Sequence, residues 1–292
     1  MSRCPFHACE HLFHVSVLSN IGETGIVPGV PEGAICWQSK SSNSLDSRKF
    51  KTFKAIMSNL PPSERKWRND VIRIVCISDT HGKQGVFIPD GDVVVHAGDF
   101  SSVGALQELR GFRSMIDSLS HGQKLVIAGN HDISLHTEFF ARSGSNFQRN
   151  LFKGKRFDPV AHSLECRNVI TTSSWPNYSY LEDSSCELIN PVDYSPTDIT
   201  VYGSPWQPEF CDWAYNLPKG HLLKEKWDMI PDSTDVLITH GPPIGVLDLS
   251  VYDNISCGCD NLLDAVTNRV KPRLHIFGHI HEGYGEFSFL LL

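Results

Sequence analysis

From residue 71 onwards, short apolar runs rich in β-branched residues alternate with polar or glycine-containing segments. Runs of roughly four to eight such residues, bounded by turn-forming residues, are typical of strands buried inside a sheet. Six runs have this character: VIRIVCIS (71–78), DVVVHAG (92–98), KLVIAGN (124–130), ITVYGS (199–204), DVLITHG (235–241) and RLHIFGH (273–279). The pattern therefore predicts six buried strands whose ends run into surface loops.

Between the second and third runs, residues 103–120 place apolar side chains three and four positions apart, which is the spacing of one helical face. These positions are Val103, Leu106, Leu109, Phe112, Met115, Ile116 and Leu119. Further helical stretches lie near 220–229 and 259–270. Strands that alternate with helices predict a layered α/β domain, which we place at residues 71–292.

Residues 1–70 differ from the rest of the chain. Glycine and proline turns (VPGVPEG) and a serine-rich stretch (SKSSNSLDSRKFK) occupy much of this region. Neither a strand period nor a helix period persists through it. This composition is typical of segments that bury too little apolar surface to become ordered. We therefore expect residues 1–70 to form a poorly ordered N-terminal extension.

Charge is distributed unevenly along the chain. The formal net charge is −7, but residues 1–70 carry nine Lys and Arg against six Asp and Glu, whereas the remainder carries 17 against 27. Binding along extended nucleic acid requires a basic footprint, so the acidic main body argues against it. The same acidity favours carboxylates gathered around cations.

Composition also bears on the compartment. No apolar run approaches the roughly 20 residues of a transmembrane helix, so we expect no membrane association. The first residues lack the apolar core of a secretory signal peptide. The nine cysteines are an odd number without regular spacing, which is typical of reduced thiols. We therefore expect an intracellular and cytoplasmic protein.

Oxygen and nitrogen donors follow five of the predicted strands at their carboxyl ends, where α/β sheets place their functional sites. They are Asp79, His81, Asp99, Asn130, His131, His240, His279 and His281. An Asp after a strand is usually a turn residue, and a lone histidine is usually an ordinary core or surface residue. Five such coincidences in one chain favour a shared site instead. Since His279 and His281 stand two positions apart, an extended chain points both to the same side.

Seven of these side chains form a consistent set of metal ligands. Asp79, Asp99 and Asn130 offer oxygen, and His81, His240, His279 and His281 offer imidazole nitrogen. This mixture suits borderline divalent ions such as Mn²⁺, Fe²⁺ or Zn²⁺. Seven ligands are too many for one tetrahedral ion and natural for two. Asp99 is the candidate bridge, because a carboxylate can give one oxygen to each ion.

The series DTHG (79–82), GDFS (98–101), GNHD (129–132), THGPP (239–243) and GHIH (278–281) resembles the metal-binding signature of the calcineurin-like metallophosphoesterases. The resemblance covers roughly residues 71–284. Segments such as HAGDF, YGSPWQP and HIFGHIHEGYG are similar to the fetal-brain-type metallophosphoesterase-domain-containing branch, related to the class III cyclic nucleotide phosphodiesterases. The resemblance implies an α+β fold, a four-layer α/β/β/α sandwich with a dinuclear site between the sheet edges.

The resemblance also implies a role for each motif residue. One ion falls to Asp79, His81 and His281, the other falls to Asn130, His240 and His279, and Asp99 bridges the two. His131 would contact the phosphate and act as general acid, beside a hydroxide held by the two ions, with Mn²⁺ as first choice. The implied activity is a metal-dependent phosphodiesterase acting on small phosphodiesters such as cyclic nucleotides. The alternatives are a phosphomonoesterase and a low-turnover nucleotide-binding or scaffolding protein that keeps the ions.

Two features depart from the family pattern. Ser102 stands where many members have the aspartate that orients the catalytic histidine, so we expect His131 to be a poorer acid. The chain also stops soon after GHIH, and we expect the final strands of the domain to be missing. Four aromatic residues crowd the segment SPWQPEFCDWAYNLPKG. We expect them to serve packing first, with a base-stacking surface as the alternative.

Overall fold

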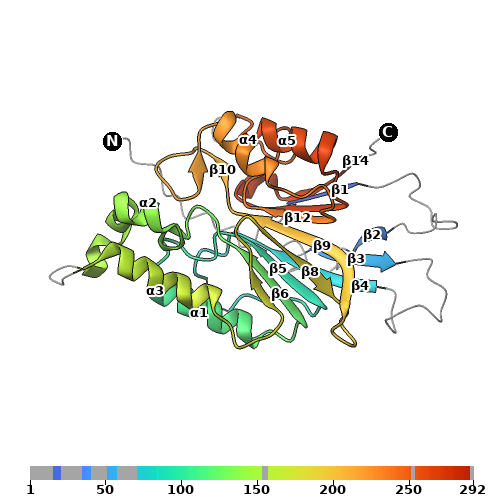
Figure 1. The fold of residues 1–292 in the computed structure, drawn as a ribbon, viewed down its shortest axis with the longest axis horizontal. Helices are drawn as coiled ribbons and strands as arrows, with labels where there is room; N and C mark the ends of the chain where they lie inside the picture. The colour runs from blue at the N-terminus through green and yellow to red at the C-terminus, as the bar shows by residue number, and fades with distance from the viewer. Residues whose placement is uncertain are drawn as a thin grey trace.

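The computed structural model describes residues 16–20, 35–40, 51–57, 71–83, 85–152, 157–250 and 254–289. Two six-stranded sheets lie face to face, and helices cover the outer face of each sheet (Figure 1). The prediction of an α+β fold, a four-layer α/β/β/α sandwich, is therefore confirmed.

The first sheet has the strand order β2-β3-β4-β5-β6-β7. Its strands are β2 (Ile35–Lys40), β3 (Lys51–Met57), β4 (Val71–Ile77), β5 (Val93–Ala97), β6 (Gln123–Ile127) and β7 (Tyr178–Tyr180). Strands β4 to β7 are parallel, and β3 pairs antiparallel with β4. Because the parallel strands end at one edge of the sheet, the loops that follow β4, β5 and β6 meet there.

The second sheet has the order β14-β1-β13-β12-β9-β8. Its strands are β14 (Gly285–Phe289), β1 (Ser16–Asn20), β13 (Leu274–Phe277), β12 (Val236–Thr239), β9 (Pro196–Ser204) and β8 (Ser184–Ile189). The central strands β9, β12 and β13 are parallel. A separate two-stranded ribbon joins β10 (Gln207–Pro208) to β11 (Asn216–Leu217).

Helices form the two outer layers (Figure 1). The first sheet is covered by α1 (Leu106–Ser118), α2 (Thr137–Arg142) and α3 (Pro159–Thr171), with the 3₁₀ segments η2 (Ile133–Leu135) and η3 (Gly144–Phe152). The second is covered by α4 (His221–Asp228), α5 (Asp260–Asp264) and the π-helical turn η4 (Ala265–Arg269), and the short η5 (His281–Gly283) follows β13. Across the described part of the chain, no helix combines the length and apolar character that a membrane span requires.

Alternation along the strands divides the hydrophobic interior into layers. In β4, Ile72, Ile74 and Cys76 belong to the core between the two sheets, whereas Val75 and Ile77 face the opposite side. Separate cores lie between the first sheet and α1 to α3 and between the second sheet and α4 and α5. Since a fully buried side chain of this size contributes about 1.5–3 kcal/mol, these layers fix which face each strand presents.

The six predicted strands correspond to β4, β5, β6, β9, β12 and β13, and the three predicted helical stretches correspond to α1, α4 and α5 with η4. The structure describes only part of residues 1–70, for which we predicted a poorly ordered extension. Three strands are described there: β2 and β3 extend the first sheet, and β1 lies between β13 and β14 in the second. The rest of the predicted extension lies outside the described residues, so its order stays a prediction.

The carboxyl ends of the two sheets are tightly packed against each other around Gly98. This residue has φ +96°, and a Cβ atom there would lie 2.5 Å from His240 Nδ1 and 2.7 Å from Ala128 O. We predict that Gly98→Ala destabilises the protein by about 1–2 kcal/mol through left-handed strain and by about 1–3 kcal/mol more through overpacking. Gly85→Ala is the matched control, because Gly85 has φ +70° and open space around the added methyl group. Urea unfolding measures both losses, and equal losses would contradict the crowding at Gly98.

Candidate metal centre

The loops that follow the central strands of both sheets converge at one place. Backbone hydrogen bonds join the loop after β4 to the loop after β5, from Asp79 N to Gly98 O and from His81 N to Asp99 O. In the second sheet, Gly278 N donates to the carbonyl oxygen of His240. The structure thus brings the predicted donors of β4, β5, β6, β12 and β13 to one region.

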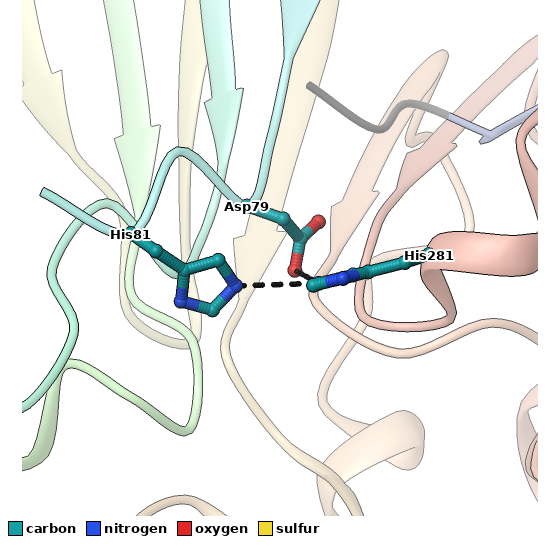
Figure 2. A group of neighbouring side chains, drawn as sticks. All are labelled: Asp79, His81 and His281. Atoms are coloured by element: carbon teal, nitrogen blue, oxygen red, sulfur yellow. Dashed lines mark hydrogen bonds and ion pairs between the residues drawn. The ribbon is translucent and has the colours of Figure 1, made fainter. Parts of the chain in front are cut away.

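A first group of donors consists of Asp79, His81 and His281, whose donor atoms all lie within 4.8 Å of one another (Figure 2). The Nε2 atoms of His81 and His281 face each other at 3.2 Å. His281 Nε2 is also 3.3 Å from Asp79 Oδ1. Two imidazole nitrogens and a carboxylate oxygen that point at one spot from distant parts of the chain are arranged as ligands of a single ion.

A second group consists of Asp99, His240 and His279, again with donor atoms within 4.8 Å. Asn130 joins it, because its Oδ1 atom lies 3.0 Å from His240 Nε2. His240 Nδ1 lies 2.8 Å from the carbonyl oxygen of Ala97. Since a carbonyl can only accept, Nδ1 carries a proton and Nε2 is turned towards the other donors.

Asp99 lies between the two groups. Its Oδ2 atom is 3.4 Å from His240 Nε2 and 4.0 Å from His81 Nε2, so one carboxylate reaches a member of each group. Its Oδ1 atom accepts a hydrogen bond of 2.8 Å from the backbone N–H of His131. Asp99 also belongs to a third combination with His81 and His131 whose donor atoms lie within 4.8 Å. This position fits a bridging ligand.

Electrostatics keeps the buried carboxylates charged. Burial alone would raise the pKa of Asp99, but the imidazoles of His240 and His131 hold it well below its usual value. Burial would also raise the pKa of Asp79, but the imidazoles of His281, His240 and His81 together outweigh this effect and lower it. Two carboxylates that stay ionised in the interior are costly without cations beside them.

The imidazoles divide into two kinds. Burial lowers the pKa of His81 to about 4 and that of His279 to about 3, so both rings are neutral and available as ligands. Burial also acts against the proton on His240, but the carboxylate of Asp99 outweighs it and raises its pKa to about 9. His240 must therefore lose a proton when it becomes a ligand.

Backbone strain is concentrated at the same residues. Four of the seven predicted ligands adopt left-handed backbone conformations: Asp79 (φ +55°), His81 (φ +45°), Asp99 (φ +56°) and His279 (φ +71°). A positive φ is uncommon in residues with a Cβ atom, and such strain is typical of functional sites. The surrounding loops hold these side chains in place at the expense of local stability.

Taken together, the donors fit two divalent ions. Each group supplies carboxylate or amide oxygen together with imidazole nitrogen, a mixture suited to Mn²⁺, Fe²⁺ or Zn²⁺. The two groups meet at Asp99. The hydrogen bond from His240 Nδ1 to the carbonyl oxygen of Ala97 orients the imidazole ring, as is common for histidines that bind metals.

Comparison with known proteins agrees with this geometry. The sequence pattern of the calcineurin-like phosphoesterases matches residues 72–283. The chain belongs to this family. Metallophosphoesterase domain-containing protein 1 of Homo sapiens is 42% identical over 215 residues, which are 73% of this chain and 61% of the human protein. A UPF0046 protein of Caenorhabditis elegans is 38% identical over 218 residues, which are 74% of this chain and 53% of the worm protein. The chain thus spans less than two-thirds of the length of these relatives.

In this calcineurin-like phosphoesterase, His131 lies beside both donor groups. Its Nδ1 atom is 2.8 Å from the carbonyl oxygen of Ser102, which can only accept, so Nδ1 carries a proton. One face of the ring stacks on Trp213 with centroids 4.0 Å apart, and His81 meets it edge-on at 4.6 Å. These contacts leave Nε2 as the ring nitrogen that can act on a bound molecule.

Ser102 orients His131 differently from the family's usual aspartate. Its backbone carbonyl accepts from His131, while its side-chain hydroxyl donates to the carbonyl oxygen of His81 at 2.9 Å. The histidine therefore has an orienting acceptor, although the residue type at position 102 gave no sign of one.

Asp132, to which the sequence assigned no role, holds together the loops that carry the predicted metal ligands. Its Oδ2 atom accepts from the N–H groups of Asp99 and Gly129, at 2.9 and 2.8 Å. Its Oδ1 atom accepts from the N–H and hydroxyl groups of Ser101, at 2.9 and 2.6 Å. One buried carboxylate thus fixes the loop after β5 to the loop after β6.

Two buried histidine–threonine pairs stabilise the loops that carry the predicted ligands. His96 Nε2 is 3.1 Å from the hydroxyl of Thr80, which separates the ligands Asp79 and His81 in the sequence. His275 Nε2 is 2.8 Å from the hydroxyl of Thr239, the residue before His240. His96 is fully buried. The signal for His275, a histidine inside a buried strand, was present but not used.

The aromatic segment mainly serves packing, as expected. Trp213 and Tyr215 are buried, and Trp206 Nε1 donates to Asp183 at 2.9 Å, whereas Phe210 is 55% exposed. A groove of about 980 Å³ opens instead beside the loop after β4. Its walls come mainly from α1 and η3 and include Gly82, Val103, Gln107, Glu108, Arg110 and Asn150.

Loss of the shared carboxylate should affect both ions. We predict that Asp99→Ala lowers the Mn²⁺ content per chain more than Asp79→Ala does, because only Asp99 reaches both donor groups. Asp228→Ala is the control, since this exposed carboxylate pairs with Lys224 on α4. Equilibrium dialysis followed by elemental analysis measures the ions retained. An Asp99→Ala protein that keeps two ions per chain would contradict the bridging role.

Proposed function

We propose that this phosphoesterase is a metal-dependent phosphodiesterase that hydrolyses small phosphodiesters such as cyclic nucleotides, with Mn²⁺ as the preferred ion. The observation that carries the proposal is the pair of donor groups that share Asp99, with His131 beside them. Two divalent ions, when bound, lower the pKa of a water ligand towards neutrality and neutralise phosphate oxygens.

The side chains of the protein hold the general acid in position and supply a proton. Asp99 lies within reach of both donor groups and, through His131 N, ties the acid to them. The Nδ1–H bond to Ser102 fixes the ring, so Nε2 is the atom that gives its proton to the leaving oxygen of the ester. This role requires the protonated ring at the start of the reaction.

Two features support a small phosphodiester as substrate. The second motif reads Gly98-Asp99-Phe100-Ser101-Ser102, without the arginine that the protein phosphatases carry there. The acidic main body disfavours an extended nucleic acid, so we propose no such partner and no membrane.

We also propose a cytoplasmic location. The cysteines at 76, 166 and 259 are buried as thiols. Burial raises the pKa of the Cys166 thiol to about 11, so it stays protonated and unreactive. Reduced thiols of this kind suit a reducing compartment.

A substrate panel tests the proposed activity. The purified protein is expected to hydrolyse bis-p-nitrophenyl phosphate and cyclic nucleotides with Mn²⁺, to lose activity in EDTA, and to regain it when Mn²⁺ is added back. The Asp99→Ala variant is the negative control. A clear preference for p-nitrophenyl phosphate would make the protein a phosphomonoesterase. Tight nucleotide binding without turnover would make it a binding or scaffolding protein.

The proposed role of His131 as general acid leads to a separate prediction. We expect His131→Ala to lower turnover of cyclic nucleotides by about 10²–10⁴-fold, the usual contribution of general acid catalysis. Hydrolysis of bis-p-nitrophenyl phosphate should fall far less, because nitrophenolate leaves without a proton. Steady-state rates on the two substrates give the comparison, with the exposed His221→Ala as control. Equal losses on both substrates would remove the acid role.

A further inference from the structure

We propose that Glu108 is the positioning residue for His131 and acts on it through a single peptide unit. The inference rests on the proposed function, in which His131 is the proton donor. Ser102 has no carboxylate with which to orient His131, and Glu108 supplies one instead.

Glu108 stands in the first turn of α1 and turns back towards the loop after β5. Its Oε2 atom accepts from the backbone N–H groups of Val103, at 3.2 Å, and Ala105, at 2.9 Å. Its Oε1 atom accepts from the N–H of Ser102 at 3.1 Å. The carboxylate therefore holds three backbone N–H groups of the loop, at residues 102, 103 and 105, with both of its oxygens.

One of these bonds continues directly to the histidine. The N–H of Val103 and the carbonyl of Ser102 belong to the same peptide unit. In a trans peptide these two groups point in opposite directions. Glu108 accepts from one end of this unit, and His131 Nδ1 donates to the other at 2.8 Å. The charge of Glu108 thus polarises the carbonyl and makes it a stronger acceptor for the protonated ring.

The neighbouring contacts limit how this peptide unit can rotate. Gln148 Nε2 donates to the carbonyl oxygen of Val103 at 2.7 Å, and the hydroxyl of Ser102 donates to the carbonyl of His81 at 2.9 Å. The loop is therefore held on both sides of the unit that contacts His131. Glu108 also caps α1, as a glutamate at this position commonly does. A test must therefore separate capping from positioning.

Glu108→Gln is the informative variant. An amide keeps the size of the side chain but carries no charge, and its NH₂ group, which cannot accept, replaces one of the two oxygens that hold Ser102 N–H and Val103 N–H. Glu138→Gln is the matched control, because Glu138 is an exposed first-turn glutamate of α2. Thermal melts of the two variants measure the loss due to the helix terminus alone.

Two readouts decide the proposal. Cyclic nucleotide hydrolysis by Glu108→Gln should fall about 10- to 100-fold, the effect of losing a hydrogen bond to a charged group, with little change on bis-p-nitrophenyl phosphate. In ¹⁵N-labelled metal-free protein, the Nδ1–H resonance of His131, assigned by its absence in His131→Ala, should shift or broaden in Glu108→Gln but not in Glu138→Gln.

Other outcomes would overturn the proposal. Equal losses on the two substrates, or an Nδ1–H resonance identical to that of the unmodified protein, would reduce Glu108 to a helix cap. Glu108→Ala serves as a second variant if the amide disturbs folding. If the unmodified protein hydrolyses no phosphoester, the proposed function fails, and the resonance of His131 still decides whether Glu108 holds the ring.

Discussion

The structure depends on one electrostatic constraint: two ionised carboxylates are buried where the ends of two sheets meet. Asp79 and Asp99 are almost inaccessible to solvent, and neighbouring imidazoles keep their pKa values low. Burial of such charges is unfavourable unless counter-charges and hydrogen bonds surround them. The strained backbone at the predicted ligands, the backbone hydrogen bonds to Asp132 and the close contact at Gly98 all hold the other predicted ligands around these two carboxylates.

Much of this arrangement could be predicted from the sequence because it depends on local patterns. Buried strands appear as apolar runs, and the residues just beyond neighbouring parallel strands, such as Asp99 after β5 and Asn130 after β6, must lie at one edge of a sheet. The contributions of Glu108, Asp132 and His275 could not be predicted in this way. Each acts through backbone groups or a single hydroxyl, and residue type does not reveal which backbone group a side chain will meet.

The strands of the N-terminal region show the other limit of sequence reasoning. Residues 16–20 and 51–57 have no persistent alternation, yet they pair with β13 and β4, whose register is set by their own buried faces. Such strands are determined by the neighbours that offer them hydrogen bonds, and not by their own pattern. The layered centre of the fold, in contrast, is specified by its apolar faces on both sides.

The division of ligands between the two sheets has a consequence for the order of assembly. Each donor group combines side chains from both sheets, and partners such as His81 and His281 are 200 positions apart in the chain. During synthesis the first sheet, whose last strand ends at Tyr180, can form before His240, His279 and His281 have been added to the chain. The centre is therefore complete only after His281 has emerged and the two sheets have docked. Assembly of the proposed metal centre is then one of the last events of maturation.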